Sequence, residues 1–266
     1  MRGVATTDSQ PPRCNPSQTT ARFSQQLTVF CDFDGPIVDV SNRYYLTYQI
    51  GLADTRSFYQ AQGINLPIQQ LTKKQFWQMK QDRVPDVEIA MRSGLYGEQI
   101  DFFLGRVVEI VNQPALLNED KIQPGVSWAL ALLHSRGVRL VLVTLRLTSQ
   151  ATQILRNHGL TRLFSGIYGT EDSDAAYQNY SELKTQLLAK AIAEQSALAK
   201  HPISGWMVGD TEADLIAGQT LSIPTIALTC GIRSQFYLKQ FQPTHIDSDL
   251  LAAANYILAK NRAFGG

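Results

Sequence analysis

The chain has 266 residues, of which 44% are hydrophobic and 18% charged, and its 24 basic and 23 acidic side chains give a net charge of +1. This length suffices for a globular core plus a second module, and the balanced charge excludes the basic surface that nucleic acids or acidic membranes require. No apolar run approaches the roughly 18 residues of a membrane span. Three scattered cysteines fit neither a disulfide framework nor a zinc site, so we expect a cytoplasmic protein.

The first segment, residues 1–25, is dominated by Thr, Ser, Gln, Pro and Arg and has hardly any aliphatic side chains. This composition predicts a disordered tail, and the segment lacks the apolar stretch of a secretory signal. We interpret Cys14 within it as an incidental thiol.

An apolar run then begins at Leu27 and continues to Cys31, interrupted only by Thr28. It predicts a strand that is buried on both faces, as in a parallel sheet. Asp32 and Asp34 follow it directly, and two carboxylates at positions i and i+2 of an extended segment point the same way. Because open α/β sheets bind ligands beyond the carboxyl ends of their strands, these acids can share a metal or a substrate. The alternative is an acidic turn that caps a helix.

The next region, residues 39–121, mixes aromatic and long polar side chains and shows no convincing buried strand. Ile100, Phe103, Val107 and Val111 recur at helical spacing, and glycines and prolines divide the region into several segments. These patterns predict an inserted all-α module over residues 39–121, between two parts of a core formed by residues 26–38 and 122–266.

Beyond residue 122 the patterns alternate between helix and strand. Strands are predicted at residues 138–143, 166–170, 206–208 and 225–229, and helices at residues 126–136, 148–158, from Ser181 onward, at 213–219 and at 250–260. Strands that alternate with helices indicate right-handed βαβ units. The predicted fold class is therefore α/β, with a Rossmann-like parallel sheet.

Further functional groups follow the later strands. Thr144 ends the strand VRLVLV, Asp210 follows a short strand with Asp214 four residues later, and Lys184 stands in the first turn of a helix. The carboxyl ends of parallel strands meet at one edge of the sheet, so these groups should converge on the first two aspartates. Clustered carboxylates repel one another unless a cation neutralises them. Oxygen ligands of this kind suit Mg²⁺.

The segments DFDG and GDTEAD, together with Thr144 and Lys184, resemble the four motifs of the haloacid dehalogenase (HAD) superfamily in order and spacing. The resemblance covers residues 27–37 and 122–230. The insert lies where this superfamily carries its C1 caps, as in phosphoglycolate phosphatase-like and β-phosphoglucomutase-like members. The resemblance therefore implies a HAD-like core with an inserted helical C1 cap.

The resemblance also implies catalytic roles. Asp32 would be the nucleophile that forms an aspartyl-phosphate, and Asp34 would be the general acid for the leaving alcohol and then the base for water. Thr144 would hydrogen-bond a phosphoryl oxygen. Lys184 would neutralise the nucleophile and the phosphoryl group, although Lys190 on the same helix is an alternative.

The metal ligands implied by the resemblance are the carboxylates of Asp32 and Asp210 and the main-chain carbonyl of Asp34, with Asp214 as a supporting residue. Mg²⁺ held there and the lysine would remove the repulsion between the nucleophile and an anionic substrate. The alternative interpretation of Asp214 is an acid in the first turn of a helix, where the helix dipole favours negative charge.

This chain departs from the family pattern at three positions. Pro36 stands where the family generally has Thr, Lys184 lacks the Pro that often follows it, and Arg146 stands two residues after Thr144 at a variable position. We consider Arg146, together with Arg83 and Arg92 of the insert, as candidates for binding an anionic substrate.

The function expected from these observations is Mg²⁺-dependent hydrolysis of a small phosphorylated metabolite. A phosphomutase of the same fold and a phosphate-binding or regulatory protein without turnover are the alternatives. Dehalogenation is disfavoured because it needs neither the second acid, Asp34, nor a metal.

Overall fold

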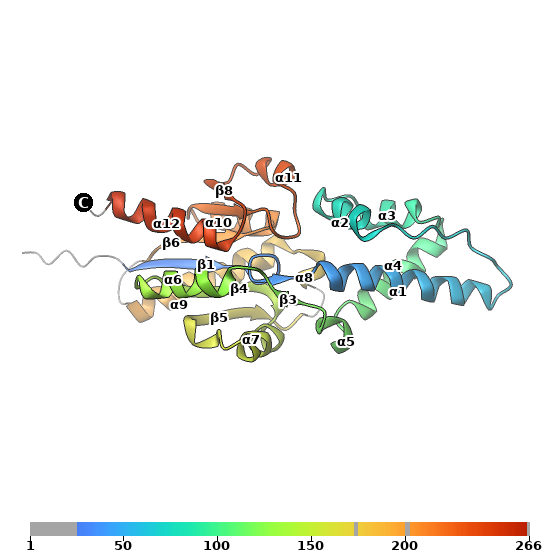
Figure 1. Cartoon of the computed structure of the whole chain (residues 1–266), viewed down its shortest axis with the longest axis horizontal. Coiled ribbons are helices and arrows are strands. Elements are labelled where there is room, and N and C mark those ends of the chain that lie inside the picture. Colours follow the sequence, from blue (N-terminus) through green and yellow to red (C-terminus); the bar gives the residue numbers. More distant parts are fainter. Residues whose placement is uncertain (1–25, 173–174, 200–202, 265–266) are drawn as a thin grey trace, which may run out of the picture.

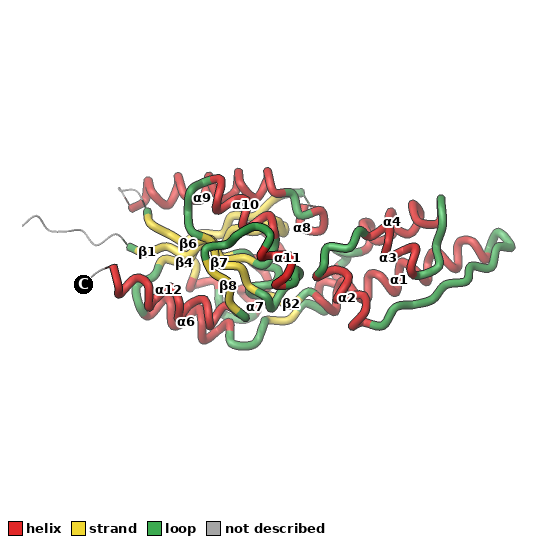
Figure 2. Tube along the Cα trace, turned by 90° about the horizontal axis from the view of Figure 1, so that it is seen from above, coloured by secondary structure: helices red, strands yellow, loops and turns green. Residues whose placement is uncertain are grey.

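A computed structural model describes residues 26–172, 175–199 and 203–264 of the chain. The tail expected at residues 1–25 lies outside the described residues. The described part has a sheet-containing core at one end and a group of helices at the other (Figures 1 and 2). Among its helices, none is both long and apolar enough to cross a membrane.

The core contains a six-stranded sheet in the order β5-β4-β1-β6-β7-β8, in which all neighbouring strands are parallel. The strands are β1 (Leu27–Cys31), β4 (Arg139–Leu147), β5 (Phe164–Thr170), β6 (Ser204–Gly209), β7 (Thr225–Leu228) and β8 (His245–Asp247). All five residues of β1 are buried, because β1 lies inside the sheet and both of its faces are covered. The predicted α/β class with a parallel sheet is confirmed.

Helices cover both faces of the sheet (Figure 2). One face carries α8 (Ala175–Gln178), α9 (Ser181–Ala199) and α10 (Glu212–Thr220), and the other carries α6 (Val126–Ser135), α7 (Thr148–Asn157) and α12 (Leu250–Phe264), while η1 (Thr161–Leu163) and α11 (Gln235–Lys239) are short connecting elements. Side chains of β1 alternate between the two layers: Phe30 packs with Leu188 of α9, whereas Val29 belongs to the cluster that contains Leu130 of α6. The period of two along a strand produces this division.

The insert is helical, with α1 (Ser41–Gln60), α2 (Lys73–Gln81), α3 (Asp86–Arg92), α4 (Glu98–Ile110) and α5 (Pro114–Leu117). We call these five helices the cap. Tyr48 of α1 stacks on Phe76 of α2, with ring centroids 4.8 Å apart, and meets Phe103 of α4 edge-on. Two short strands, β2 (Val38–Asp39) and β3 (Lys121–Ile122), pair antiparallel where the cap joins the core. Strands of two residues are too short to show a periodic pattern in the sequence.

Strand β4 is longer than the sequence pattern indicates. It continues past Thr144 to Leu147, and its pairing with β5 shifts register between Val143 and Leu147. Within this irregular part, the backbone N–H of Arg146 donates to Thr144 Oγ1 at 3.1 Å. The prediction that the strand ends at Thr144 is therefore wrong, because Leu147 pairs with Thr170 of β5 beyond the irregular part.

Candidate active site

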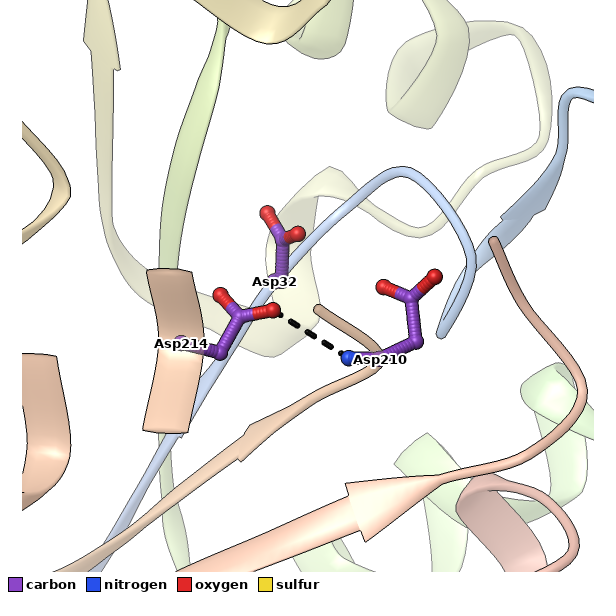
Figure 3. Close-up of side chains that lie close together, drawn as sticks. All are labelled: Asp32, Asp210 and Asp214. Atoms are coloured by element: carbon purple, nitrogen blue, oxygen red, sulfur yellow. Dashed lines mark hydrogen bonds between the residues drawn. The ribbon is translucent and has the colours of Figure 1, made fainter. Parts of the chain in front are cut away.

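Three aspartates converge at the carboxyl edge of the sheet (Figure 3). Asp32 follows β1, Asp210 follows the neighbouring strand β6, and Asp214 lies in the first turn of α10. One carboxylate oxygen from each lies within 4.8 Å of the other two, and all three side chains are buried. The two predicted strand ends are adjacent in the sheet, which is why residues far apart in the sequence meet here.

Lys184 reaches this cluster from α9. Its Nζ lies 2.7 Å from Asp32 Oδ1 and 2.7 Å from Asp214 Oδ1, and the side chain is 1% exposed. Leu188, one turn later, packs in the core and holds the helix against the sheet. Lys190 is exposed. Of the two lysines considered from the sequence, the structure places Lys184 in the cluster.

Asp214 is held by more than this ion pair. Its Oδ2 accepts hydrogen bonds from the backbone N–H groups of Asp210 at 3.2 Å (Figure 3) and Thr211 at 3.0 Å. Asp214 is therefore both a helix-capping acid and the second partner of Lys184, and its carboxylate fixes the turn that presents Asp210.

The charges in the cluster do not balance. Burial and then the charge of Asp214 raise the pKa of Asp32 to about 7, with Lys184 acting in the opposite direction. Burial and the charges of Asp214 and Asp32 also raise the pKa of Asp210 well above its usual range. One lysine against three carboxylates leaves excess negative charge in a buried site, and a bound cation would relieve it.

The surroundings of Asp210 fit a metal ligand. Its Oδ2 accepts a hydrogen bond from the backbone N–H of Ile232 at 2.5 Å, whereas its buried Oδ1 has no hydrogen-bond partner among the described residues. A Cβ on Gly35 or Gly231 would lie 2.1 or 2.0 Å from this carboxylate, so only glycine allows the two loops to approach it. A buried oxygen without a donor, beside two more carboxylates, is a donor set that suits Mg²⁺.

The side chain of Asp34 lies in a different environment, between two arginines. Its carboxylate is 3.2 Å from Arg43 Nη2 and 2.8 Å from Arg146 Nη2. Asp120 completes the arrangement, because it lies 2.9 Å from Arg43 and 2.6 Å from Arg146. The four side chains form a closed ring of alternating charge that connects the core to α1 of the cap and to the segment before β3.

Sequence reasoning did not identify Arg43 and Asp120 as site residues. Both are single charged residues outside any motif, separated by 77 positions in the chain. The one signal available was that Arg43 stands in the first turn of the helix that follows the DFDG motif. Many helices carry an arginine there without a functional role, so the signal is weak.

A small cavity opens between these groups. Its lining includes Asp32, Asp34, Thr144, Arg146 and Asn179, and its volume is about 20 Å³. The Arg146 side chain is 2% exposed, and its Nε and Nη1 have no hydrogen-bond partner among the described residues. The cavity therefore presents a hydroxyl group and two unpaired guanidinium donors beside two carboxylates.

The two candidate arginines of the cap have different positions. Arg83 follows α2 and reaches the core, where its Nε lies 2.9 Å from Glu212 Oε1. Arg92 is on the exposed side of α3 and pairs with Glu88 of the same helix at 2.6 Å. The structure brings Arg83 to the edge of the candidate site and does not place Arg92 among the residues that line it.

The raised pKa of Asp32 leads to a testable pH dependence. The carboxyl titrates near pH 4 in the unfolded chain and near pH 7 in the folded, metal-free protein. Between these values the folded state binds the extra proton, so the free energy of unfolding falls as the pH rises through this window. We expect Mg²⁺, which binds the carboxylate form, to raise Tm more at pH 8 than at pH 5.5 in thermal unfolding. Equal shifts at both pH values would contradict this linkage, and Asp210→Asn should remove most of the shift.

Comparison with known proteins agrees with this geometry. Residues 29–228 match the family model for haloacid dehalogenase-like hydrolases. Pyrophosphatase PpaX of Halalkalibacterium halodurans is 25% identical over 122 residues, which are 46% of this chain and 53% of that protein. A protein of Dickeya dadantii named "Probable phosphatase IndB" is 27% identical over 240 residues, which are 87% of this chain and 94% of that protein.

The matched part spans about half the length of the first three curated relatives, at 53%, 58% and 56%. Among solved structures, a haloacid dehalogenase-like family protein from Streptococcus pneumoniae aligns with a TM-score of 0.57 at 22% identity, over 87% of this chain and 98% of that one. A likeness at this identity concerns the fold alone.

Proposed function

The chain belongs to the haloacid dehalogenase-like hydrolase family, and on this basis we propose that it is a Mg²⁺-dependent phosphatase that hydrolyses a small phosphorylated metabolite. The observation that carries the proposal is the contrast between two aspartates two residues apart. Asp32 lies against Lys184 in the carboxylate cluster, whereas Asp34 lies between two arginines. Two carboxylates in different environments suit two different catalytic roles.

In the first step, a carboxylate oxygen of Asp32 attacks the phosphorus atom and the bond to the leaving oxygen breaks, which forms an aspartyl-phosphate. Lys184 offsets negative charge on Asp32 while the phosphoryl group approaches. Thr144, which lines the same cavity, donates a hydrogen bond from its hydroxyl group to a phosphoryl oxygen. Lys184 also pairs with Asp214, whose Oδ1 lies 2.7 Å from its Nζ.

Asp34 transfers protons in both steps. In its protonated form it donates a proton to the departing oxygen and becomes the carboxylate that pairs with Arg43 and Arg146. That carboxylate then accepts a proton from the water that attacks phosphorus, which releases phosphate and restores Asp32. Arg43 and Arg146 hold the Asp34 carboxylate from two sides, so its position is set before the substrate arrives. Such preorganisation lowers the cost of reaching the productive geometry.

The proposed metal ligands are Asp32, Asp210 and the main-chain carbonyl of Asp34, with Asp214 as the supporting residue. When bound, Mg²⁺ would neutralise charge on the phosphoryl oxygens and the nucleophile. The unpaired Oδ1 of Asp210 supports this assignment. The free cysteines Cys31 and Cys230 are consistent with a reducing, cytoplasmic setting, which is part of the proposal.

The names of relatives support a phosphorylated substrate. Those proteins are named as a pyrophosphatase, a phosphatase and, in two further cases, phosphoglycolate phosphatases. The names differ in substrate and agree in the hydrolysis of a phosphate bond. The family therefore supports the reaction type, whereas the substrate class depends on the residues around the site.

Phosphate release from p-nitrophenyl phosphate tests the proposed function. We expect turnover with Mg²⁺, none after EDTA, and recovery when Mg²⁺ is restored in excess. Activity that survives EDTA would contradict the role of the metal. If calorimetry shows that Mg²⁺ binds but neither this ester nor a panel of metabolite phosphates is hydrolysed, the phosphomutase or the regulatory alternative would replace the phosphatase.

A further inference from the structure

A second small cavity adjoins the one beside Asp32. Its lining combines Tyr44, Lys80 and Arg83 of the cap with Tyr177 and Arg233 of the core. The two cavities have Ala176, Asn179, Thr211 and Ile232 in common. A group bound in the second cavity would therefore lie next to the phosphoryl group attacked by Asp32.

The second cavity is basic. Lys80, Arg83 and Arg233 contribute to its lining, and no acidic residue does so in the described part of the chain. The partners of these cations lie outside the lining: Glu212 is 2.9 Å from Arg83 and 2.8 Å from Arg233, and Asp86 is 2.8 Å from Lys80. Three cations thus share two carboxylates, and the surplus positive charge is available to an anionic ligand.

Burial strengthens the interaction of this surplus positive charge with a bound anion. Lys80 is 7% exposed and Arg233 is 4% exposed. Burial lowers the pKa of Lys80, although the carboxylate of Asp86 opposes the shift. Charges that are shielded from water interact more strongly with a bound anion than surface charges do.

Asn179 stands where the two cavities meet. Its backbone has a positive φ of 56°, which is uncommon for a residue other than glycine. Thr211 Oγ1 lies 3.3 Å from Asn179 Oδ1 and 2.9 Å from Asp214 Oδ2, and the buried Nδ2 of Asn179 has no partner among the described residues. The amide group of Asn179 is therefore available to a ligand at the junction of the two cavities. Strained residues of this kind are concentrated at binding sites.

We propose that Lys80, Arg83 and Arg233 form a second anion subsite, and that the substrate carries another negative group on its leaving group, the part that departs from phosphorus when Asp32 attacks. This inference rests on the proposed phosphatase function and names its substrate class. The second group is a carboxylate or a phosphate, since both accept hydrogen bonds from guanidinium and ammonium groups.

A matched set of substrates tests the subsite. 2-Phosphoglycolate supplies a carboxylate, pyrophosphate supplies a second phosphate, and 2-hydroxyethyl phosphate has the length of the first without its charge. We expect kcat/KM for either 2-phosphoglycolate or pyrophosphate to exceed that for 2-hydroxyethyl phosphate, which lacks the second anionic group, by about tenfold or more. The preferred charged substrate identifies the second group. Equal values for all three would overturn the subsite and leave the phosphatase proposal intact.

Arg83→Gln tests the residues. The Arg83 side chain is 42% exposed, and Arg233 remains paired with Glu212 in the variant, so folding should be preserved. We expect KM for the preferred charged substrate to rise about tenfold, with kcat/KM for 2-hydroxyethyl phosphate almost unchanged. Arg83→Lys should retain part of the preference. Arg56→Gln, at an exposed arginine of α1 in the same cap, should leave kcat/KM unchanged for both substrates.

Two other outcomes would count against the subsite or against the reaction. If Arg83→Gln lowers kcat/KM equally for substrates with and without a second anionic group, Arg83 acts by holding the cap and the subsite proposal is wrong. If no substrate turns over, calorimetric binding to Asp32→Asn decides: tighter binding of 2-phosphoglycolate than of 2-hydroxyethyl phosphate supports the subsite while overturning hydrolysis. Equal binding of the two ligands would overturn both the subsite and the hydrolysis proposal.

Discussion

Asp32→Asn is expected to abolish phosphate release, with a loss on the order of 10⁴-fold or more, because the amide cannot act as the nucleophile. Folding should survive the change. The pKa of Asp32 is raised to about 7, so its carboxylate form is unfavourable in the metal-free protein, and a neutral side chain of the same shape removes that cost. We expect Tm without metal at pH 8 to be unchanged or higher.

The informative result is the combination of lost activity and retained stability, measured by phosphate release and thermal unfolding on the same preparations. Asp101→Asn changes an exposed acid in α4 of the cap and should alter neither property. Substantial turnover by Asp32→Asn would show that the attacking group is elsewhere and would refute the proposed mechanism.

Lys184→Met is expected to reduce both activity and stability. Its Nζ lies 2.7 Å from Asp32 and 2.7 Å from Asp214 in the interior, so the variant leaves two buried carboxylates without their cation. Removing one partner from a buried ion pair typically costs about 3–5 kcal/mol. The methionine fills a similar volume, so packing changes contribute little.

The loss of stability in Lys184→Met should depend on pH in a defined direction. Without the lysine, the pKa of Asp32 in the folded state rises further. At pH 5.5 Asp32 is protonated in the folded state of both proteins. At pH 8 the folded variant must either keep this proton or carry an unpaired buried charge, and both lower the free energy of unfolding. Urea unfolding without metal should therefore show the larger deficit at pH 8. Lys190→Met, at an exposed position of the same helix, should remain within about 0.5 kcal/mol of the wild type. Equal deficits in the two variants would contradict the role of Lys184.

The parallel sheet and the residues at its carboxyl edge could be predicted from local patterns in the sequence. An apolar run such as Leu27–Cys31 is stable only as an interior strand, and its direction puts Asp32 beyond its carboxyl end. Asp210 follows a second such strand, β6, which pairs with β1. These inferences succeeded because buried strands and the groups at their ends depend on local patterns and on the handedness of βαβ units.

The way the cap meets the core could not be predicted from the sequence, because it depends on tertiary packing. The ring formed by Asp34, Arg43, Asp120 and Arg146 includes the contact between Asp34 and Arg146, which are 112 positions apart, and the contact between Arg83 and Glu212 spans 129 positions. A single arginine on a helix follows no periodic rule, and its partner depends on the packing of two separately folded layers. The sequence therefore indicated the edge of the sheet where the proposed site lies, whereas the charged residues around that edge depend on how cap and core pack together.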